Sequence, residues 1–464
     1  MKKVVVVGGG ISGLSAGSLL REKGYDVTIF EASNRLGGKI LTTELSGIAI
    51  DAGPDAFLVR EPEMKELCVS LGLADDLVAP QPRTAKIWVD GAMHSLPKNQ
   101  FLGIPLDFDE LDDLGLLTAR GIDRARRDLI LDNNSPIGDE TVGSLIRRRL
   151  GDEVMDKLVG PLLGGINAGD PDKISLNTAV PHLAKAAGGQ ASLVLSIQSY
   201  LRSLDRNPHD PVFLTCPDGL GRVVEALKER LEDNIVLNQQ VQSLVPENGK
   251  WIVRGQDDVQ ADAVILSTPA YASASILNGH NPDVSKWLSK IDYASIAFTL
   301  LSFPTGSVQP FDGSGFLVAK SEGLLMTACT WSSSKWGHLE NKEHTYLRVS
   351  TGRAGDDRAF SLSDDELVAT LLKELAFTVG LTAEPSDCRI VRWPRSFPQY
   401  DLDHFHKVKH IQRLLQEEVP GVFVAGAAFN GLGLSACIRD GKSGAQAAIN
   451  YLENNDTDDT NSGG

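Results

Sequence analysis

Three glycines near the start of the chain have the spacing of a phosphate-binding turn, Gly8-x-Gly10-x-x-Gly13. In such a turn the first glycine permits a tight reversal, the second lets the backbone approach a pyrophosphate, and the third lets a helix pack closely on the preceding strand. The phosphate would bind at the N-terminus of that helix. We therefore predict that a dinucleotide binds along the whole turn, which consists of Gly8, Gly9, Gly10, Ile11, Ser12 and Gly13.

The flanking sequence supplies the elements that such a turn needs. The run Val4–Val7 predicts a buried parallel strand, residues 14–23 predict a helix that ends before Gly24, and residues 26–30 predict a second strand. Glu31 follows this second strand, eighteen residues after Gly13, where a carboxylate can accept hydrogen bonds from an adenosine ribose. The pattern favours a dinucleotide-binding βαβ unit over an ordinary α/β crossover.

A second group of glycines after Glu31, Gly37-Gly38 and Gly53, indicates which dinucleotide binds. A nicotinamide dinucleotide has no need of glycines at this point, whereas the flat ring system of a flavin needs backbone that can lie close to it. Together with the first turn, these residues resemble the superfamily of FAD-dependent amine oxidases, phytoene desaturases and protoporphyrinogen oxidases. The resemblance implies FAD as the cofactor and adds to the cofactor-binding residues Ala32, Arg35, Gly37, Gly38, Lys39, Gly53, Pro54, Asp55 and Ala56.

The same resemblance adds three later places to the predicted cofactor site. Val241 matches the valine whose backbone holds the adenine in this family, although an ordinary strand valine would have the same sequence context. Trp393, in an extended run before Pro394, is expected to pack against the flavin, with a core tryptophan as the alternative. Near the C-terminus a strand and a glycine turn enter a helix whose N-terminus can stabilise negative charge on the flavin. This entry contains Gly433, Leu434 and Ser435.

The order of these segments predicts an α/β fold with a Rossmann-like FAD-binding domain, a mixed-sheet substrate domain and a helical insertion. A chain of 464 residues is too long for one core. We assign residues 1–61, 206–280 and 401–452 to the FAD-binding domain, 62–205 to the mainly helical insertion and 281–400 to the substrate-binding domain. The polar, acidic residues 453–464 are predicted to form a disordered tail.

Composition disfavours several classes of partner. The net charge of −16 argues against nucleic acid, and no apolar run approaches the roughly 20 residues that a membrane helix needs. Five cysteines without paired spacing indicate a reducing cytoplasm and predict neither a metal site nor a disulfide framework. The cluster Arg147–Arg149 is interpreted as a solvated helix face, with a carboxylate-facing or membrane-facing cluster as the alternatives, so peripheral membrane contact stays open.

Longer strings narrow the resemblance to the soluble bacterial porphyrinogen oxidases of haem biosynthesis. The strings extend over nearly the whole chain and include Leu96-Pro97-Lys98, residues 161–170, residues 327–331, Pro398-Gln399-Tyr400 and residues 431–438. Two stretches depart from the family pattern, Asp403-His404 and Leu434-Ser435-Ala436.

This resemblance implies a reaction and its reactants. A flavin would take hydride from coproporphyrinogen III, dioxygen would reoxidise the flavin with formation of hydrogen peroxide, and three rounds would give coproporphyrin III. Protoporphyrinogen IX is the alternative substrate, and a ferrochelatase is a candidate partner for the product. Because the cofactor carries the difficult step, we name no catalytic side chain.

The resemblance points to Gly315, Phe316 and Leu317 as a wall beside the substrate macrocycle, with a core position as the alternative for Phe316. Animal and plant protoporphyrinogen oxidases also have a carboxylate-binding arginine before the strand that matches residues 87–89. This chain has Ala85 there, with Arg83 and Lys86 nearby. The difference favours the substrate with four carboxylates over the substrate with two.

Two other classes compete with this reading. The nearer is a different flavin oxidase of the superfamily, an amine oxidase or a carotene desaturase. An amine oxidase would need an aromatic cage at the flavin, whereas the C-terminal turn offers only Phe429 and Asn430, and a desaturase would usually present more apolar surface. The other class is a flavin-binding sensor or chaperone without turnover. Such a protein would bind flavin but would form no fluorescent porphyrin from coproporphyrinogen in air.

Overall fold

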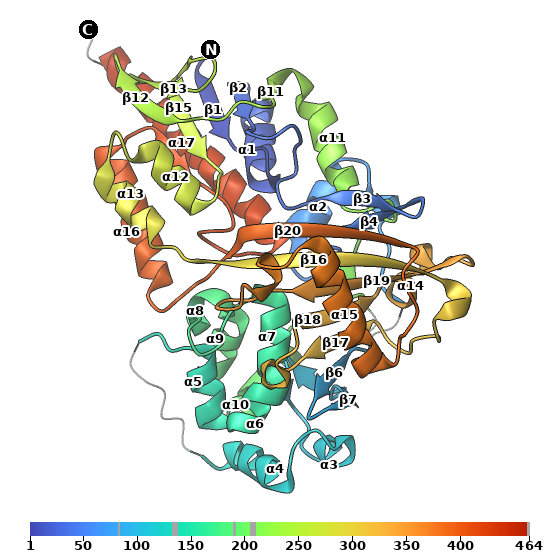
Figure 1. Ribbon diagram of the computed structural model, residues 1–464. Helices are drawn as coiled ribbons and strands as arrows, with labels where there is room; N and C mark the ends of the chain where they lie inside the picture. Colours follow the sequence, from blue (N-terminus) through green and yellow to red (C-terminus); the bar gives the residue numbers. More distant parts are fainter. Residues whose placement is uncertain (82–83, 132–137, 189–191, 205–209, 462–464) are drawn as a thin grey trace.

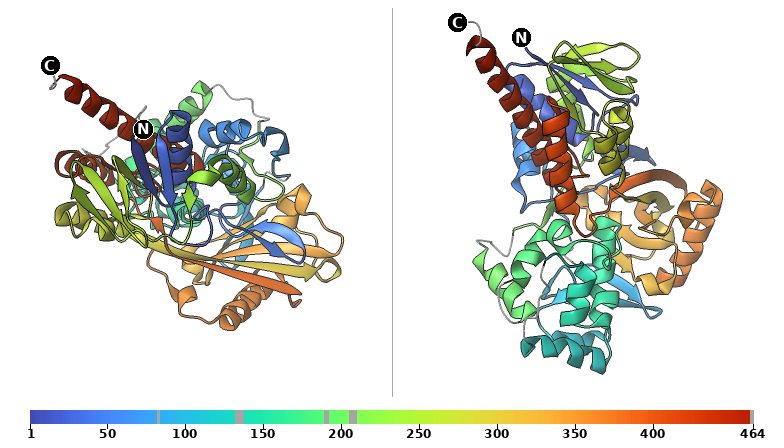
Figure 2. Two further views of the ribbon diagram at one scale, coloured as in Figure 1. Left: turned by 90° about the horizontal axis from the view of Figure 1, so that it is seen from above. Right: turned by 90° about the vertical axis from the view of Figure 1, so that its left-hand side faces the viewer.

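The computed structural model describes residues 1–81, 84–131, 138–188, 192–204 and 210–461. Arg83 lies outside these residues. The molecule has three parts, with a parallel sheet and its helices at the top of Figure 1, a larger sheet across the middle and a group of short helices below. Both termini lie at the same end of the molecule, as Figures 1 and 2 show.

A five-stranded parallel sheet organises the upper part, and its strands come from both ends and the middle of the chain. Along the sheet the order is β11 (Ile235–Val236), β2 (Asp26–Phe30), β1 (Lys3–Val7), β15 (Ala263–Leu266) and β21 (Val422–Val424). The predicted βαβ unit is confirmed, with α1 at Ile11–Glu22 between β1 and β2.

The central strand β1 is buried on both faces, which explains its uninterrupted run of valines. Val4 and Val6 pack into a core with α1, α11 (Gly221–Leu231) and α17 (Leu434–Asn461). Val5 and Val7 pack into a second core on the opposite face. The elements of this second core are α12 (Ala270–Leu277), α13 (Pro282–Ser289), α16 (His404–Glu418) and the small sheet of β12 (Ser243–Glu247), β13 (Lys250–Arg254) and β14 (Val259–Ala261).

A seven-stranded mixed sheet forms the middle part. The strand order is β20 (Asp387–Pro398), β16 (Tyr293–Pro304), β19 (His344–Thr351), β18 (Met326–Trp331), β17 (Gly315–Val318), β6 (Lys86–Val89) and β7 (Ala92–Ser95). Helix α15 (Asp364–Val379) packs on the face that we call the back face. The opposite face, the front face, meets the upper part and α7 (Gly160–Asn167).

The structure differs from the predicted helical insertion at two places. Strands β6 and β7 lie within residues 62–205 but extend the seven-stranded sheet, because β6 pairs in parallel with β17. Helix α2 (Pro62–Ser70) packs against α17 in the core of the upper part. The remaining helices of the segment are α3 (Glu110–Leu114), α4 (Ala119–Arg126), α5 (Val142–Arg149), α6 (Asp152–Val154), α7, α8 (Leu176–Ala179), α9 (Pro181–Ala187) and α10 (Leu193–Ser203).

The basic cluster at the end of α5 is not a solvated face, so that interpretation is wrong. Arg147 forms ion pairs at 2.7–3.0 Å with the carboxylates of Asp152, Asp156 and Asp172. Arg148 pairs with Glu140 at 2.7 Å. Of the three alternatives, the carboxylate-facing one holds, and the carboxylates belong to the chain itself.

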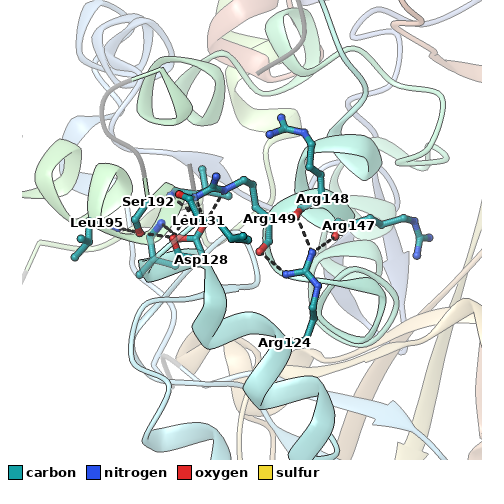
Figure 3. Close-up of polar contacts among 10 residues, drawn as sticks. Arg124, Asp128, Leu131, Arg147, Arg148, Arg149, Ser192 and Leu195 are labelled. Carbon is teal, nitrogen blue, oxygen red and sulfur yellow. Dashed lines mark hydrogen bonds and ion pairs between the residues drawn. The ribbon is translucent and has the colours of Figure 1, made fainter. Parts of the chain in front are cut away.

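The third arginine of the cluster is buried. The Arg149 guanidinium lies 2.6 Å from the carboxylate of Asp128, and that carboxylate also accepts from the Ser192 hydroxyl and from the first backbone N–H groups of α10. Figure 3 shows this pair together with Arg124, which donates to the carbonyl oxygens of all three arginines. The cluster therefore ties α4, α5 and α10 together.

The predicted disordered tail is wrong for residues 453–461, where α17 continues as a helix to Asn461. The last buried apolar residue of this helix is Leu452. Between Ala445 and Asn461 the sequence contains no glycine or proline, so nothing interrupts propagation of the helix. Residues 462–464 lie outside the described part. Within the described residues, no helix is both long and apolar enough to cross a membrane.

Candidate flavin and substrate site

The turn between β1 and α1 has the geometry that its glycines predict. Gly8 has φ +110°, and its N–H donates to the carbonyl of Phe30 at 2.7 Å. A Cβ added at Gly13 would lie 2.0 Å from the Gly8 carbonyl oxygen and 2.5 Å from the Ser267 hydroxyl. Gly8 therefore permits the reversal, and Gly13 lets α1 pack against the turn.

Gly10 has a different environment. A Cβ added there would meet only the Cα of Gly38, at 4.0 Å, so the protein leaves open space beside this residue. No side chain caps α1, and its first turn contains no acidic residue. The side chains of Ile11 and Ser12 are buried, which leaves only the backbone of this turn for a ligand. Free N–H groups at a helix start beside open space fit a pyrophosphate.

Glu31 connects this turn to the loop that follows β2. One carboxylate oxygen accepts from the Gly9 N–H at 2.8 Å, and the other accepts from the Ser33 N–H and hydroxyl at 2.9 and 2.7 Å. An ionised carboxylate offers about four acceptor positions. Three are in use, so one remains for a ribose hydroxyl. Val241 lies near this point, because the Gln239 N–H donates to the Glu31 carbonyl at 2.9 Å.

Arg35 fixes the second glycine pair. Its guanidinium donates to the carbonyls of Leu36, Gly38 and Ile40 at 3.1, 2.6 and 3.2 Å. Burial lowers the pKa of Arg35, and the nearby Glu31 charge opposes that shift. Arg35 thus acts as a clamp on the loop, whereas Ala32 is exposed beside it.

Lys39 is the cation that this loop leaves for a ligand. Its ammonium makes no hydrogen bond or ion pair with a described residue, and burial lowers its pKa, opposed by interaction with Cys437 of α17. A Cβ added at Gly53 would lie 2.0 Å from the Lys39 carbonyl oxygen. The glycine at position 53 is therefore required by close packing of this backbone. Lys39 therefore lies near both Gly53 and Cys437 of α17. A lysine ammonium at this place suits a cofactor that carries many hydrogen-bond acceptors.

The loop Gly53–Ala56 is held by Arg348 of the seven-stranded sheet and by Lys335 of the short helix α14 (Ser332–Lys335), neither of which the sequence indicated. Arg348 of β19 donates to the Gly53 carbonyl at 2.5 Å and lies 3.2 Å from the Asp55 carboxylate. Lys335 pairs with the same carboxylate at 2.7 Å. Burial alone would raise the pKa of Asp55, but Lys335 and Arg348 outweigh it and hold this pKa well below its usual range. Pro54 and Ala56 are half-buried in the same loop.

Two further predicted residues also contact the protein. The Trp393 indole N–H donates to the Ala52 carbonyl at 2.8 Å, which places Trp393 beside the loop Gly53–Ala56. The Ser435 hydroxyl donates to the Glu61 carbonyl at 3.0 Å and accepts from the Met64 N–H at 3.2 Å, so it fixes the start of α2.

The C-terminal glycine turn ends in open space. Gly433 is exposed and α17 begins at Leu434, one residue before the start expected near Ser435. A Cβ added at Gly433 would meet nothing within 4 Å. The helix start therefore leaves room for a ligand beside its backbone.

The three residues predicted as a substrate wall lie on β17, and they do not all face the same side of the sheet. Side chains of a strand alternate between its faces. Leu317 packs toward the helical part on the front face, and Gly315 pairs with Thr330, which in turn pairs with Arg348. Phe316 is 2% exposed and packs on the back face against the core that includes α15. Phe316 is therefore a core residue and does not line the front face.

Comparison with known proteins agrees with this architecture. The chain matches the flavin containing amine oxidoreductase family over residues 11–449. It is 34% identical to coproporphyrinogen III oxidase of Bacillus subtilis (strain 168), over 97% of this chain and 98% of the relative. It is 30% identical to coproporphyrinogen III oxidase of Staphylococcus aureus (strain NCTC 8325 / PS 47), over 97% of this chain and the whole relative.

Solved structures have the same fold. A crystal structure from Exiguobacterium sp. 255-15, provisionally named a protoporphyrinogen oxidase, superposes with a TM-score of 0.88 at 30% identity, over 97% of this chain and 99% of the other. Cyclohexylamine oxidase from Brevibacterium oxydans superposes with a TM-score of 0.71 at 17% identity, over 97% of this chain and 99% of the other, which shows a shared fold. The flavin cofactor expected from the glycine turns is confirmed, and the chain belongs to the flavin containing amine oxidoreductase family.

Proposed function

We propose that the protein is an FAD-dependent oxidase that converts coproporphyrinogen III to coproporphyrin III, with dioxygen as the electron acceptor and hydrogen peroxide as the by-product. The observation that carries this proposal is similarity along the full length to two bacterial enzymes of that name, at 34% and 30% identity. The balanced reaction consumes three molecules of dioxygen and forms three of hydrogen peroxide for each porphyrin.

When bound, FAD supplies the hydride acceptor, and the residues of the chain supply binding and orientation. We assign the pyrophosphate to the uncapped start of α1 beside Gly10, the ribose to the remaining acceptor position of Glu31, and the adenine to the backbone at Val241. Lys39 would meet acceptor atoms farther along the cofactor. Each assignment uses a group whose hydrogen-bonding capacity the described residues do not fill completely.

The front face of the seven-stranded sheet is suited to a flat, apolar macrocycle. Phe298, Ser350, Ala328 and Leu317 stand in one cross-strand row from β16 to β17. The loop that holds Asp55 is joined to the same face by Arg348, which fixes the distance between the flavin loop and the substrate wall. Apolar walls with a few polar groups at the edge bind and orient such ligands and keep water out.

An amine oxidase is less consistent with the site. Its aromatic cage would have to come from Phe429 at the C-terminal turn, but Phe429 is 2% exposed and packs in the core behind the parallel sheet. The side-chain amide of Asn430 is bonded to Asp440 at 2.6 Å. Neither residue of that turn is available to surround a substrate amine.

The direct test compares initial rates of porphyrin fluorescence for coproporphyrinogen III and protoporphyrinogen IX in air, each corrected for oxidation without enzyme. Each additional charge-assisted contact is worth about 1.5–3 kcal/mol, so we expect a preference of about tenfold or more for coproporphyrinogen III at low concentration. A peroxidase-coupled assay should detect three peroxides per porphyrin. Equal rates, or faster oxidation of protoporphyrinogen IX, would refute the substrate and leave the flavin oxidase standing.

Two finer aspects belong to the same proposal. All five cysteines are free thiols, which supports a reducing cytoplasm as the location. A ferrochelatase that accepts the porphyrin is the partner implied by this chemistry, and faster metal insertion from an enzyme-bound product than from free porphyrin would support transfer.

Peripheral membrane contact is supported by exposed apolar side chains near the start of α10. Leu129, Ile130, Leu131 and Leu195 are 45%, 84%, 37% and 39% exposed, and Leu129 and Leu195 line a cavity of about 640 Å³. Flotation with lipid vesicles should be reduced in the Ile130→Glu variant, and equal flotation of variant and wild type would exclude this contact.

A further inference from the structure

We propose that Arg353 binds a carboxylate of the substrate at the edge of the front face, a role that rests on the proposed porphyrinogen oxidase function. Arg353 lies in the turn that follows β19, where Gly352 and Gly355 have φ values of +87° and +77°. The chain looks acidic overall, with 61 acidic and 45 basic residues, so a cation without an acidic partner needs an explanation.

The guanidinium of Arg353 is half-buried and unsatisfied. Its Nε is buried and has no hydrogen-bond partner among the described residues, and the terminal nitrogens likewise form no hydrogen bond or ion pair there. Burial lowers the pKa of Arg353, although the group remains charged because the starting value is far above neutral. A buried donor without a partner costs free energy, so such a group points to an absent ligand.

The Asp356 carboxylate, three residues after Arg353, already has a partner. Asp356 accepts two hydrogen bonds at 2.8 Å from the guanidinium of Arg358, one on each oxygen. Arg358 also donates to the carbonyls of Gly323 and Leu324 at 3.1 and 3.0 Å, which fixes it in place. Asp356 therefore attracts Arg353 without pairing with it.

The turn that carries Arg353 borders the apolar part of the front face. The Ala354 N–H donates to the carbonyl of Ala168 at 2.7 Å, just after α7. Ala354 packs with the cluster that contains Ile296, Phe298 and Trp393. Because Trp393 bonds to the loop before Gly53, this cluster joins the predicted flavin edge to the turn. An apolar surface with a free arginine at its edge suits an apolar macrocycle that carries carboxylates.

The position of Arg353 also fits the absence of an arginine at residue 85, where this chain has alanine. The animal and plant enzymes are expected to bind a carboxylate before the strand that corresponds to β6, whereas Arg353 follows β19, which is separated from β6 by β18 and β17. A substrate with carboxylates around its rim can be held from this second side. Arg353 thus supplies a basic contact that the sequence at residue 85 lacks.

The test uses Arg353→Gln, which removes the charge, and Arg353→Lys, which keeps it. For coproporphyrinogen III we expect Arg353→Gln to raise KM about tenfold to a hundredfold with little change in kcat, because a charge-assisted contact made equally in ground and transition states is lost. Arg353→Lys should recover part of the affinity. The tetramethyl ester of the same porphyrinogen, which has no carboxylates, should show the same KM with wild type and both variants.

Arg413→Gln is the matched control, because Arg413 is exposed on α16 and pairs with Glu417 of the same helix. Flavin content and melting temperature should match wild type in all three variants. Binding of the product coproporphyrin III to the holoprotein, followed by fluorescence quenching, gives a second readout that requires no turnover.

An unchanged KM and product Kd in Arg353→Gln would overturn the proposal. An equal loss in Arg353→Lys and Arg353→Gln, with a lower melting temperature and the same change for the ester, would also overturn it in favour of a structural role. A wild-type protein that oxidises no porphyrinogen would refute the proposed function separately, while the product-binding comparison still tests Arg353.

Discussion

The two glycines Gly10 and Gly13 belong to one motif, but the structure predicts opposite consequences for their replacement. Gly10 has φ −74° and ψ 174°, a conformation open to any residue, and open space beside its Cα. Gly10→Val should therefore change the free energy of unfolding of the apoprotein by no more than about 0.5 kcal/mol. The same side chain would occupy the place assigned to the pyrophosphate.

The loss of cofactor affinity follows from the contacts that the pyrophosphate would make. A hydrogen bond to a charged group is worth about 1.5–3 kcal/mol, so losing two of them weakens FAD about a hundredfold to ten-thousandfold. Gly13→Ala is the matched control. Its Cβ would lie 2.0 Å from the Gly8 carbonyl oxygen, and such overpacking costs roughly 1–3 kcal/mol or more in the apoprotein itself.

The assay measures the flavin-to-protein absorbance ratio, the Kd for added FAD and the melting temperature of the apoprotein. Gly10→Val should lose flavin and keep the apoprotein melting temperature, whereas Gly13→Ala should lower that temperature before any FAD is added. Saturating FAD should stabilise wild type but not Gly10→Val, because only a bound ligand shifts the folding equilibrium. If Gly10→Val retained stoichiometric flavin with an unchanged Kd, the pyrophosphate assignment would be wrong.

Three further predictions concern burial, the flavin and pH. Asp128→Asn removes the carboxylate partner of a buried arginine and should lower the free energy of unfolding by about 3–5 kcal/mol in urea titrations, and a loss below 1 kcal/mol would contradict a buried pair. Trp393→Phe keeps a ring but loses the bond to Ala52, so a shifted flavin absorption spectrum is expected, and an unchanged spectrum with a lower melting temperature would leave only the core role. Burial lowers the pKa of His404 to about 4, so the unfolded chain binds more protons between about pH 6.5 and 4, and stability is lost as the pH falls through that window. His404→Gln should flatten this loss, whereas Asp51→Asn should steepen it, because burial raises the pKa of Asp51 to about 6 and gives the opposite slope.

The parts of the fold that could be predicted depend on short stretches of contiguous sequence. β1, α1 and β2 are determined by a buried valine run, a glycine turn and a helix end within 30 residues. The same holds for the entry into α17, where the predicted start differs by one residue from Leu434. Local conformational needs, such as the positive φ of Gly8, leave a direct trace in the sequence.

The parts that could not be predicted depend on pairing between distant segments. Strand β6 was assigned to the helical insertion because its partner β17 lies more than 200 residues later in the chain. Which face of the sheet meets the loop Gly53–Ala56 depends on the contact of Arg348 with Gly53 and Asp55, and these residues lie far apart in the sequence. For that reason the sequence left Phe316 open between the wall and the core, and the structure places it in the core on the back face.

Ion pairs between residues far apart in the sequence could not be predicted either. The cluster Arg147–Arg149 looked solvated because its partners lie outside α5, and one of them, Asp128, is completely buried. Counting charges along a helix detects neighbours three or four residues away, whereas the pair of Arg149 and Asp128 joins residues 21 positions apart. The composition could predict an acidic protein but not which cations remain unpaired.

The basic residues near the front face differ in whether they have an acidic partner. Arg348 contacts the loop Gly53–Ala56, because its guanidinium donates to the Gly53 carbonyl and pairs with Asp55, and it lies 3.8 Å from the Phe298 ring centroid. Lys335 shares the same carboxylate, so the central positive charge has a fixed counter-ion. A carboxylate of the substrate at this point would have to displace Asp55, at the cost of leaving that buried acid unpaired. Arg353, at the border of the apolar cluster, has no such competitor. Under the proposed function, we therefore expect a macrocycle whose charges lie on its rim to point a carboxylate toward Arg353 and not toward Arg348.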